Sequence, residues 1–171
     1  GGILFQGGRF RRLKQYQKLL ATECVADLTP LEQVDWFRNF LPNRLVLGDP
    51  ASRDAAIHAI QACIPHGTLL PTAIDRLRPG RLASEATVHA VERSQSGDDF
   101  VYDLVITDAS GEMIETWEGL TLHRVANGAP TESWPAALLS TYLSRRVREL
   151  TGQRSLVLDL SFNPRAGRRA R

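Results

Sequence analysis

The segment between Asp49 and Pro65 constrains the fold more than any other part of the chain. Asp49 is a favourable N-cap, Pro50 suits the first helical position, and Pro65 cannot continue a helix, so the sequence predicts a helix of about 14 residues. Alanine, isoleucine and cysteine occupy almost every side of this helix, whereas a surface helix keeps a broad polar face. The helix therefore has to be enclosed, and a sheet wrapped around it is the expected enclosure.

Strand patterns lie on both sides of this helix. The predicted strands are residues 10–20 and 23–28 before it, and 68–77, 83–93, 100–107 and 113–125 after it. In the first pair we expect Tyr16, Val25 and Leu28 to point inward. Residues 100–107 have two apolar faces and should lie centrally in the sheet, and residues 108–111 carry a hairpin signal.

The flanking segments are less regular. Residues 31–43 contain Trp36, Phe37 and Phe40 and predict a short amphipathic helix or a packed loop. Residues 136–150 predict an amphipathic helix, 155–162 a last strand, and 163–171 a flexible arginine-rich tail. We therefore divide the chain into a domain of residues 1–127 and a C-terminal segment of residues 128–171 that leads to a following domain.

Composition narrows the function classes. The chain has 171 residues and a net charge of +2, but four arginines lie in its last seven residues, and without them 17 basic groups face 19 acidic ones. The body is not basic, so nucleic-acid binding is not expected. The two cysteines form no CxxC pair, and no apolar run of about 18 residues or leader peptide is visible. We expect a cytoplasmic protein with no membrane partner, no bound metal and no bound cofactor.

One helix embraced by consecutive antiparallel strands is the hot-dog arrangement, of class α+β. Asp54, His58 and Gln61 fall at positions i, i+4 and i+7 of the helix and share one polar stripe. A carboxyl group held in apolar surroundings tends to stay protonated and can act as a general acid. The alternative is that Asp54 only complements the helix dipole and contacts His58 at the surface.

The segment around this stripe resembles the second-half motif of polyketide synthase dehydratase domains. In that motif a proline precedes the catalytic aspartate by four residues and a glutamine or histidine follows it by four, as Pro50, Asp54 and His58 do here. Residues 4–10 are similar to the start of the family's second hot-dog, residues 69–71 to the strand after the helix, and residues 103–122 to its closing hairpin. The variant Asp-Pro-x-x-Arg-Asp-Ala is most similar to the iterative type I synthases that make enediyne polyenes.

The resemblance implies dehydration of a 3-hydroxyacyl chain to a trans-2-enoyl thioester. The acyl carrier protein, a partner, would carry the substrate on phosphopantetheine. Asp54 and His58 would be catalytic, with Asp54 protonating the departing hydroxyl. The substrate-binding residues would be Gln61, Arg53, Pro50, Leu70 and Pro71.

Two departures from the family pattern stand out. The base in these enzymes is a histidine of a His-x-x-x-Gly-x-x-x-x-Pro motif in the first hot-dog, and no histidine here has that context. We therefore expect the C-terminal half of a double hot-dog, inactive without the N-terminal hot-dog, and a homodimer is also expected. Arg53 is the second departure, because an aliphatic residue is common before the aspartate; its charge either acts on Asp54 or meets the carrier's phosphate.

Two other functions stay open at this point. The first is a non-catalytic hot-dog that binds acyl chains or carrier protein as a scaffold. The second, weaker one is a thioesterase of hot-dog fold.

Overall fold

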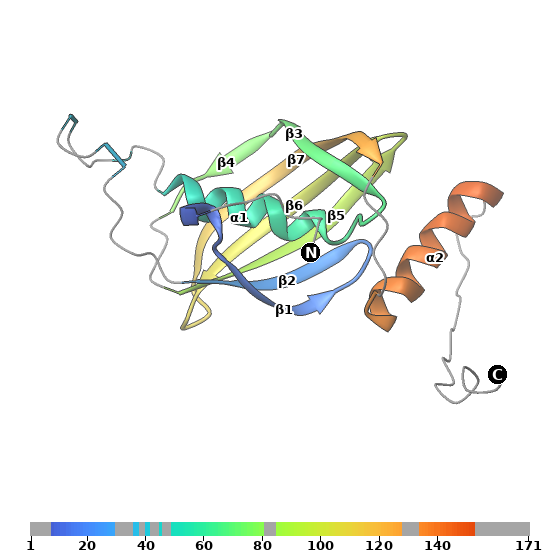
Figure 1. Ribbon diagram of the computed structural model, residues 1–171, viewed down its shortest axis with the longest axis horizontal. Helices are drawn as coiled ribbons and strands as arrows, with labels where there is room; N and C mark the ends of the chain where they lie inside the picture. Colours follow the sequence, from blue (N-terminus) through green and yellow to red (C-terminus); the bar gives the residue numbers. More distant parts are fainter. Residues whose placement is uncertain are drawn as a thin grey trace.

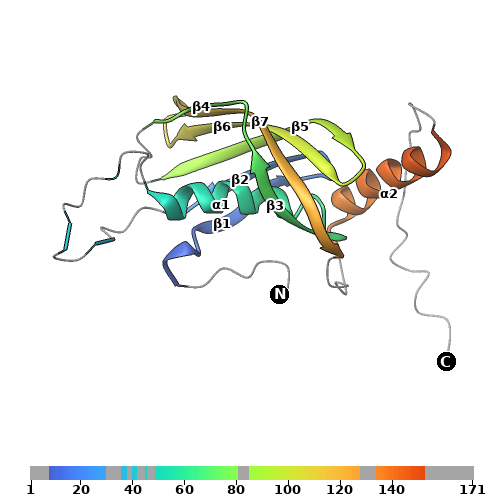
Figure 2. The ribbon, with the colours of Figure 1, turned by 90° about the horizontal axis from the view of Figure 1, so that it is seen from above.

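The computed structural model describes residues 8–29, 36–37, 40–41, 45, 49–80, 85–127 and 134–152. Its elements are a 3-10 turn at Gly8–Phe10, strands β1 (Leu13–Leu19) and β2 (Glu23–Leu28), helix α1 (Pro50–Gln61), strands β3 (Gly67–Ala73), β4 (Arg76–Arg78), β5 (Ala86–Ser96), β6 (Asp99–Asp108) and β7 (Met113–Asn127), and helix α2 (Ala136–Thr151). The strands form one antiparallel sheet that curls around α1, as Figures 1 and 2 show. This is the hot-dog fold, and the predicted fold class is confirmed.

Helix α1 begins as its sequence predicts. The Asp49 carboxylate accepts hydrogen bonds from the backbone N–H of Ser52 at 2.8 Å and from its hydroxyl at 2.9 Å, while Pro50 occupies the first turn. The Trp36 indole N–H donates to the other Asp49 oxygen at 3.0 Å. The helix ends at Gln61, earlier than the predicted end near Pro65, because the backbone N–H groups of Cys63 and Ile64 already turn back to Ile60 and Gln61. Both ends of α1 are thus fixed by local hydrogen bonds.

The sheet has the order β1-β2-β5-β6-β7-β3, with β4 paired to β7. Strand β6 lies between β5 and β7, which confirms its predicted central place. Its inward residues Phe100, Tyr102, Leu104 and Ile106 are all buried in the core cluster that also contains the buried residues of α1. The hairpin after it is also confirmed, since Asp108 accepts hydrogen bonds from the backbone of Ser110 and Glu112.

Two strand predictions were wrong in detail. Val25 is only half-buried, and the inward residues of β2 are Cys24, Ala26 and Leu28. The strand predicted over 68–77 is split into β3 and β4, which pair with different parts of β7. The split follows from Gly119 of β7, whose φ of +65° kinks that strand. A Cβ there would lie 2.0 Å from the Asp75 carboxylate, which would have to move aside, and the positive φ itself favours glycine at this position.

The C-terminal helix is confirmed, but its packing differs from a simple apolar stripe. Leu138 is buried, whereas Leu150 is 77% exposed, and the other buried residue of the helix is Arg145. The Arg145 guanidinium forms an ion pair with Glu92 of β5, and the Thr141 hydroxyl accepts a hydrogen bond from the Ala21 N–H at 2.8 Å. Helix α2 therefore docks on the end of the hot-dog (Figure 2) through the buried Leu138 together with polar contacts.

Several predictions fall wholly or mostly outside the described residues. These are the strand at 155–162, the tail at 163–171, the boundary at 128–133 and most of the segment 31–43. Within the part of the chain that the structure describes, no helix is long and apolar enough to cross a membrane.

Candidate functional site

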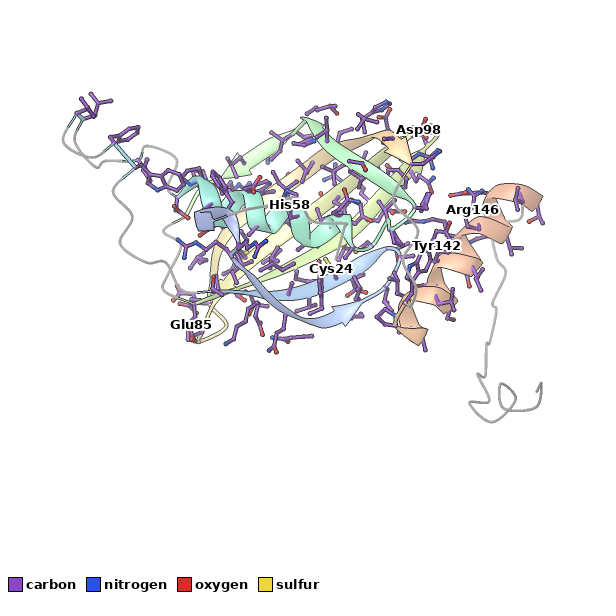
Figure 3. All side chains as sticks on the ribbon, in the orientation of Figure 1. Cys24, His58, Glu85, Asp98, Tyr142 and Arg146 are labelled. Carbon is purple, nitrogen blue, oxygen red and sulfur yellow. The ribbon has the colours of Figure 1, made fainter. Side chains whose placement is uncertain are left out.

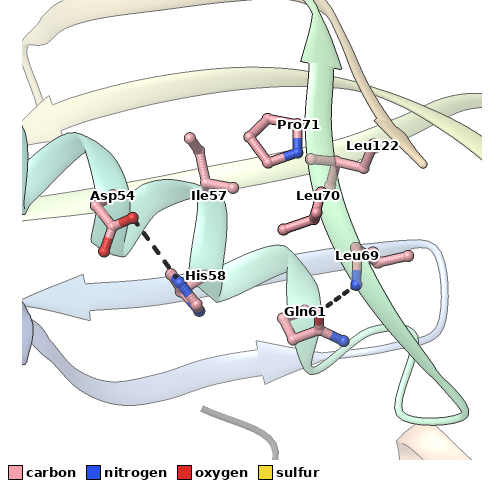
Figure 4. Close-up of a pocket in the computed structure, with 8 residues that line it drawn as sticks. All are labelled: Asp54, Ile57, His58, Gln61, Leu69, Leu70, Pro71 and Leu122. Carbon is pink, nitrogen blue, oxygen red and sulfur yellow. Dashed lines mark hydrogen bonds and ion pairs between the residues drawn. The ribbon is translucent and has the colours of Figure 1, made fainter. Parts of the chain in front are cut away.

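The polar stripe of α1 opens into a small pocket beside strand β3. Figure 4 shows this cavity, which has a volume of about 110 Å³. Its lining residues are Asp54, Ile57, His58, Gln61, Leu69, Leu70, Pro71 and Leu122. Five of the seven residues predicted for the site are therefore brought together, and Pro50 and Arg53 are not among the residues that line the pocket.

Asp54 and His58 lie at its mouth, one turn of helix apart. The Asp54 Oδ1 lies 3.8 Å from the His58 Nε2, too far for a direct hydrogen bond. The side chain of His58 is 10% exposed and that of Asp54 is 37% exposed. The desolvation that the sequence predicts for Asp54 is therefore only partial in this chain.

The electrostatics of the pair keep His58 uncharged at neutral pH. Burial lowers the pKa of His58 below its ordinary value, and the negative charge of Asp54 opposes this shift only in part. A neutral imidazole both donates and accepts a hydrogen bond. The pocket mouth thus offers a carboxyl group and a neutral imidazole side by side, which suits proton transfer to a bound ligand.

The wall opposite the stripe is apolar and belongs to an edge strand. Leu70 is 45% exposed, and Pro71, which has no N–H to offer, follows it on β3. Among the described strands, β3 pairs only with β7, so its other edge is open. The pocket therefore lies where a further strand or domain would add to the sheet.

Gln61 lines the deep end of the pocket, but backbone groups engage its amide. Its Nε2 donates to the Gly67 carbonyl at 2.6 Å and to the Ile64 carbonyl at 3.3 Å, and its Oε1 accepts from the Leu69 N–H at 2.9 Å. The whole Gln61 residue is only 4% exposed. In this structure Gln61 ties the start of β3 to α1.

Arg53 points away from the pocket. Its guanidinium binds the Glu115 carboxylate of β7 through Nε at 3.0 Å and Nη2 at 2.9 Å, a two-point contact. The contact that the structure shows for Arg53 is therefore with Glu115, and its effect on Asp54 by charge and its binding of a carrier's phosphate stay predictions. Glu115 was not predicted as part of the site from the sequence, although it shares the inward face of β7 with Trp117 and a buried acid needs a cation.

The remaining histidines lie elsewhere. His89 contacts Glu23 at 2.9 Å on the outer face, and His123 contacts Asp99 at 2.7 Å. His66 packs against Tyr142 of α2, which Figure 3 labels beside the sheet. Only His58, of the four histidines, belongs to the pocket.

Comparison with known proteins connects this geometry to a family. The family model described as polyketide synthase dehydratase N-terminal domain matches residues 2–132. The comparison with curated protein sequences finds no match.

Solved structures support the fold. The dehydratase domain of RzxB from Pseudomonas fluorescens is 17% identical with a TM-score of 0.52, and the match covers 68% of this chain and 42% of that one. The dehydratase domain from the CurJ module of the curacin polyketide synthase is 17% identical with a TM-score of 0.55, covering 70% and 43%. A trans-acyltransferase polyketide synthase enoyl-isomerase is 15% identical with a TM-score of 0.54, covering 68% and 46%.

These solved chains are much longer than the matched region, and the present chain spans less than half the length of each. At such identities the likeness establishes the hot-dog fold alone. The family itself follows from the sequence match over most of the chain: the protein belongs to the polyketide synthase dehydratase family.

Proposed function

We propose that this chain supplies the acid half of a dehydratase site that acts on a 3-hydroxyacyl thioester. The observation that carries the proposal is the pocket itself, where Asp54 and His58 of the enclosed helix face Leu70 and Pro71 of an open edge strand. A dehydratase needs an acid at the leaving hydroxyl and an apolar surface for the acyl chain, and the pocket offers both.

In the proposed reaction Asp54 donates its proton to the 3-hydroxyl as the C3–O bond breaks, and water leaves. A base removes the proton from C2, and the electron pair of that C–H bond forms the C2–C3 double bond. The base is a histidine of the other, N-terminal hot-dog, because none of the four histidines here has the family's His-x-x-x-Gly-x-x-x-x-Pro context. His58 stays uncharged and relays a proton from solvent to the Asp54 carboxylate after each turnover, accepting a proton at one ring nitrogen as it releases the proton on the other.

The chain is proposed as the second hot-dog of the double domain. The matched family model is described as an N-terminal domain, whereas the spacing of Pro50, Asp54 and His58 is that of the second half. The open edge of β3 beside the pocket supports pairing with the hot-dog that holds the base, and a second copy of the chain is the other candidate. The Arg-Asp pair at positions 53 and 54 supports the enediyne branch.

We also propose how the substrate reaches the pocket and in which compartment the protein works. A phosphopantetheine-bound substrate on an acyl carrier protein fits a pocket that opens at a sheet edge. The structure gives both Cys24 and Cys63 as free, buried thiols, which accords with the proposed cytoplasmic location.

The test is a dehydration assay on a 3-hydroxyacyl carrier protein, read by mass spectrometry as loss of water. The chain is assayed alone and together with a hot-dog that carries the missing histidine motif. We expect dehydration only in the combined reaction. Conversion by the chain alone would show that its site is complete, and failure of the combined reaction while the acyl carrier still binds would favour the non-catalytic scaffold.

A further inference from the structure

A second polar cluster begins on α1 at the residue next to Asp54, outside the residues that line the pocket, and the proposed reaction does not use it. It is centred on Glu115 of β7, whose side chain is 0% exposed, and Arg53, whose side chain is 11% exposed. Arg53 is the residue immediately before Asp54, so whatever fixes Arg53 acts on the same turn of the helix.

Every acceptor position of the Glu115 carboxylate is occupied. One oxygen accepts from the Arg53 Nε at 3.0 Å and from the Trp117 indole N–H at 2.5 Å. The other accepts from the Arg53 Nη2 at 2.9 Å and from the backbone N–H of Gly80 at 3.0 Å. An ionised carboxylate can accept about four such bonds, so the geometry of this group is saturated and rigid.

Gly80 is part of the same construction. A Cβ at this position would lie 1.6 Å from the Ile114 carbonyl oxygen, so any side chain here would push the two backbone segments apart. The glycine therefore lets the segment after β4 approach β7 closely enough to donate its N–H to Glu115. The cluster joins three separate parts of the chain: the first turns of α1, strand β7 and residue 80.

Most of the fully buried residues of α1 are alanines. Ala51, Ala55, Ala56 and Ala59 are all 0% exposed, and Ile60 is the largest buried residue of the helix. Short side chains allow close approach but interdigitate little with the sheet, so they resist rotation of the helix about its axis only weakly. Polar ties therefore add to the packing of Ile60 in setting the rotation of α1: Gln61 holds the last turn and Arg53 an early one.

We propose that Arg53 and Glu115 are positioning residues for Asp54, because their two-point ion pair sets the rotation of α1 that turns the Asp54 carboxyl group toward His58 and the pocket. Neither residue lines the pocket. The catalytic consequence rests on the proposed function, whereas the orientation itself does not and is measured separately.

The first measurement uses the 171-residue chain alone and follows the titration of the His58 imidazole by NMR. In the wild type the charge of Asp54 raises the pKa of His58 against the effect of burial, so Asp54→Asn should lower it. Arg53→Lys keeps the positive charge but loses the two-point contact with Glu115. In this background we expect Asp54→Asn to change the pKa of His58 by less than half as much as it does in the wild-type background. An equal change in both backgrounds would overturn the proposal.

Controls separate orientation from folding. Arg124→Lys alters an arginine that pairs with Asp98 and does not line the pocket, and it should leave the Asp54 effect intact. Thermal unfolding checks that Arg53→Lys is folded. If it is not, the double variant Arg53→Met with Glu115→Leu removes both charges, and the effect of Asp54→Asn on the His58 titration is measured in that variant. Loss of the Asp54 effect in Arg124→Lys as well would also count against the proposal.

The second measurement is made in the combined dehydratase reaction. Arg53→Lys should lower kcat by about tenfold while KM stays within about twofold, as expected for a misplaced acid with intact substrate binding. A kcat equal to that of the wild type would overturn the catalytic consequence. If Asp54→Asn itself had no effect on dehydration, the proposed function would fail while the NMR result on orientation still stood.

Discussion

Replacing Gln61 with methionine tests whether this residue holds the pocket together or binds the ligand. Methionine has a similar length and a similar helix propensity, so the change removes the amide and little else. The variant loses the bonds to the Gly67 and Ile64 carbonyls and leaves the Leu69 N–H without its acceptor. Because these groups are buried, the effect should be a loss of stability.

The magnitude follows from the groups left unsatisfied. Each buried backbone group without a partner costs about 1–3 kcal/mol, and the Gly67 carbonyl and Leu69 N–H are the two most affected. Since neighbouring losses are not additive, we expect a total of about 2–4 kcal/mol. For a chain of this size that corresponds to a fall in Tm of about 5–15 °C.

The assay is thermal and urea unfolding followed by circular dichroism. Gln17→Met is the matched control, because Gln17 is exposed and makes one side-chain bond, to Asp27 at 2.6 Å. This control should stay within about 0.5 kcal/mol of the wild type. If Gln61→Met is as stable as the control but no longer supports dehydration, the amide of Gln61 serves the ligand and the structural interpretation is wrong.

Three further predictions concern other parts of the fold. Arg145→Met leaves the Glu92 carboxylate, whose side chain is only 10% exposed, without its cation and should lower the free energy of unfolding by about 3 kcal/mol, measured in urea. Gly80→Ala should cost about 1–3 kcal/mol in the same assay, because the new methyl group meets the Ile114 carbonyl. Burial, aided by nearby arginines, lowers the pKa of His66 to about 4 from an ordinary value of 6.5. The unfolded chain therefore takes up more protons than the folded one in this range, and stability should fall as the pH falls from about 6.5 toward 4.

Each of these predictions has its own control and its own failure. The control for Arg145→Met is Arg148→Met, which removes an exposed arginine of α2. An equal loss of stability in these two variants would contradict the role given to the Arg145–Glu92 ion pair. Gly67→Ala meets only the flexible side chain of Arg124, so it should cost less than the change at Gly80. His66→Phe should flatten the acid side of the stability curve, and an unchanged slope would contradict the role given to His66.

The parts of the fold that sequence reasoning predicts well are those set by local chemistry. The Asp49 cap and Pro50 fix the start of α1, and the alternation along β6 places it at the centre of the sheet, because both signals depend on neighbouring residues. The stripe of Asp54 and His58 also follows from helical spacing alone. These features need no knowledge of which distant strand lies beside which.

The parts that escape sequence reasoning depend on partners far along the chain. Arg53 and Glu115 are 62 positions apart, and Arg145 and Glu92 are 53 apart. Nothing in the local sequence pairs these charges, so the sequence alone predicts a ligand contact for Arg53 and not the ion pair with Glu115. The hydrogen bonds between the Gln61 amide and the backbone of β3 were not predicted for the same reason, since they depend on how the loop after α1 returns to the helix.

The most direct test of the central claim is the single-turnover rate constant for loss of water in the combined reaction. It is measured for the wild type, for Asp54→Asn, and for Asp98→Asn, which alters an acid outside the pocket. If Asp54 is the general acid, its amide variant should be at least about 100-fold slower, while the control keeps the wild-type rate. An Asp54→Asn rate constant within about twofold of the wild type would contradict the account.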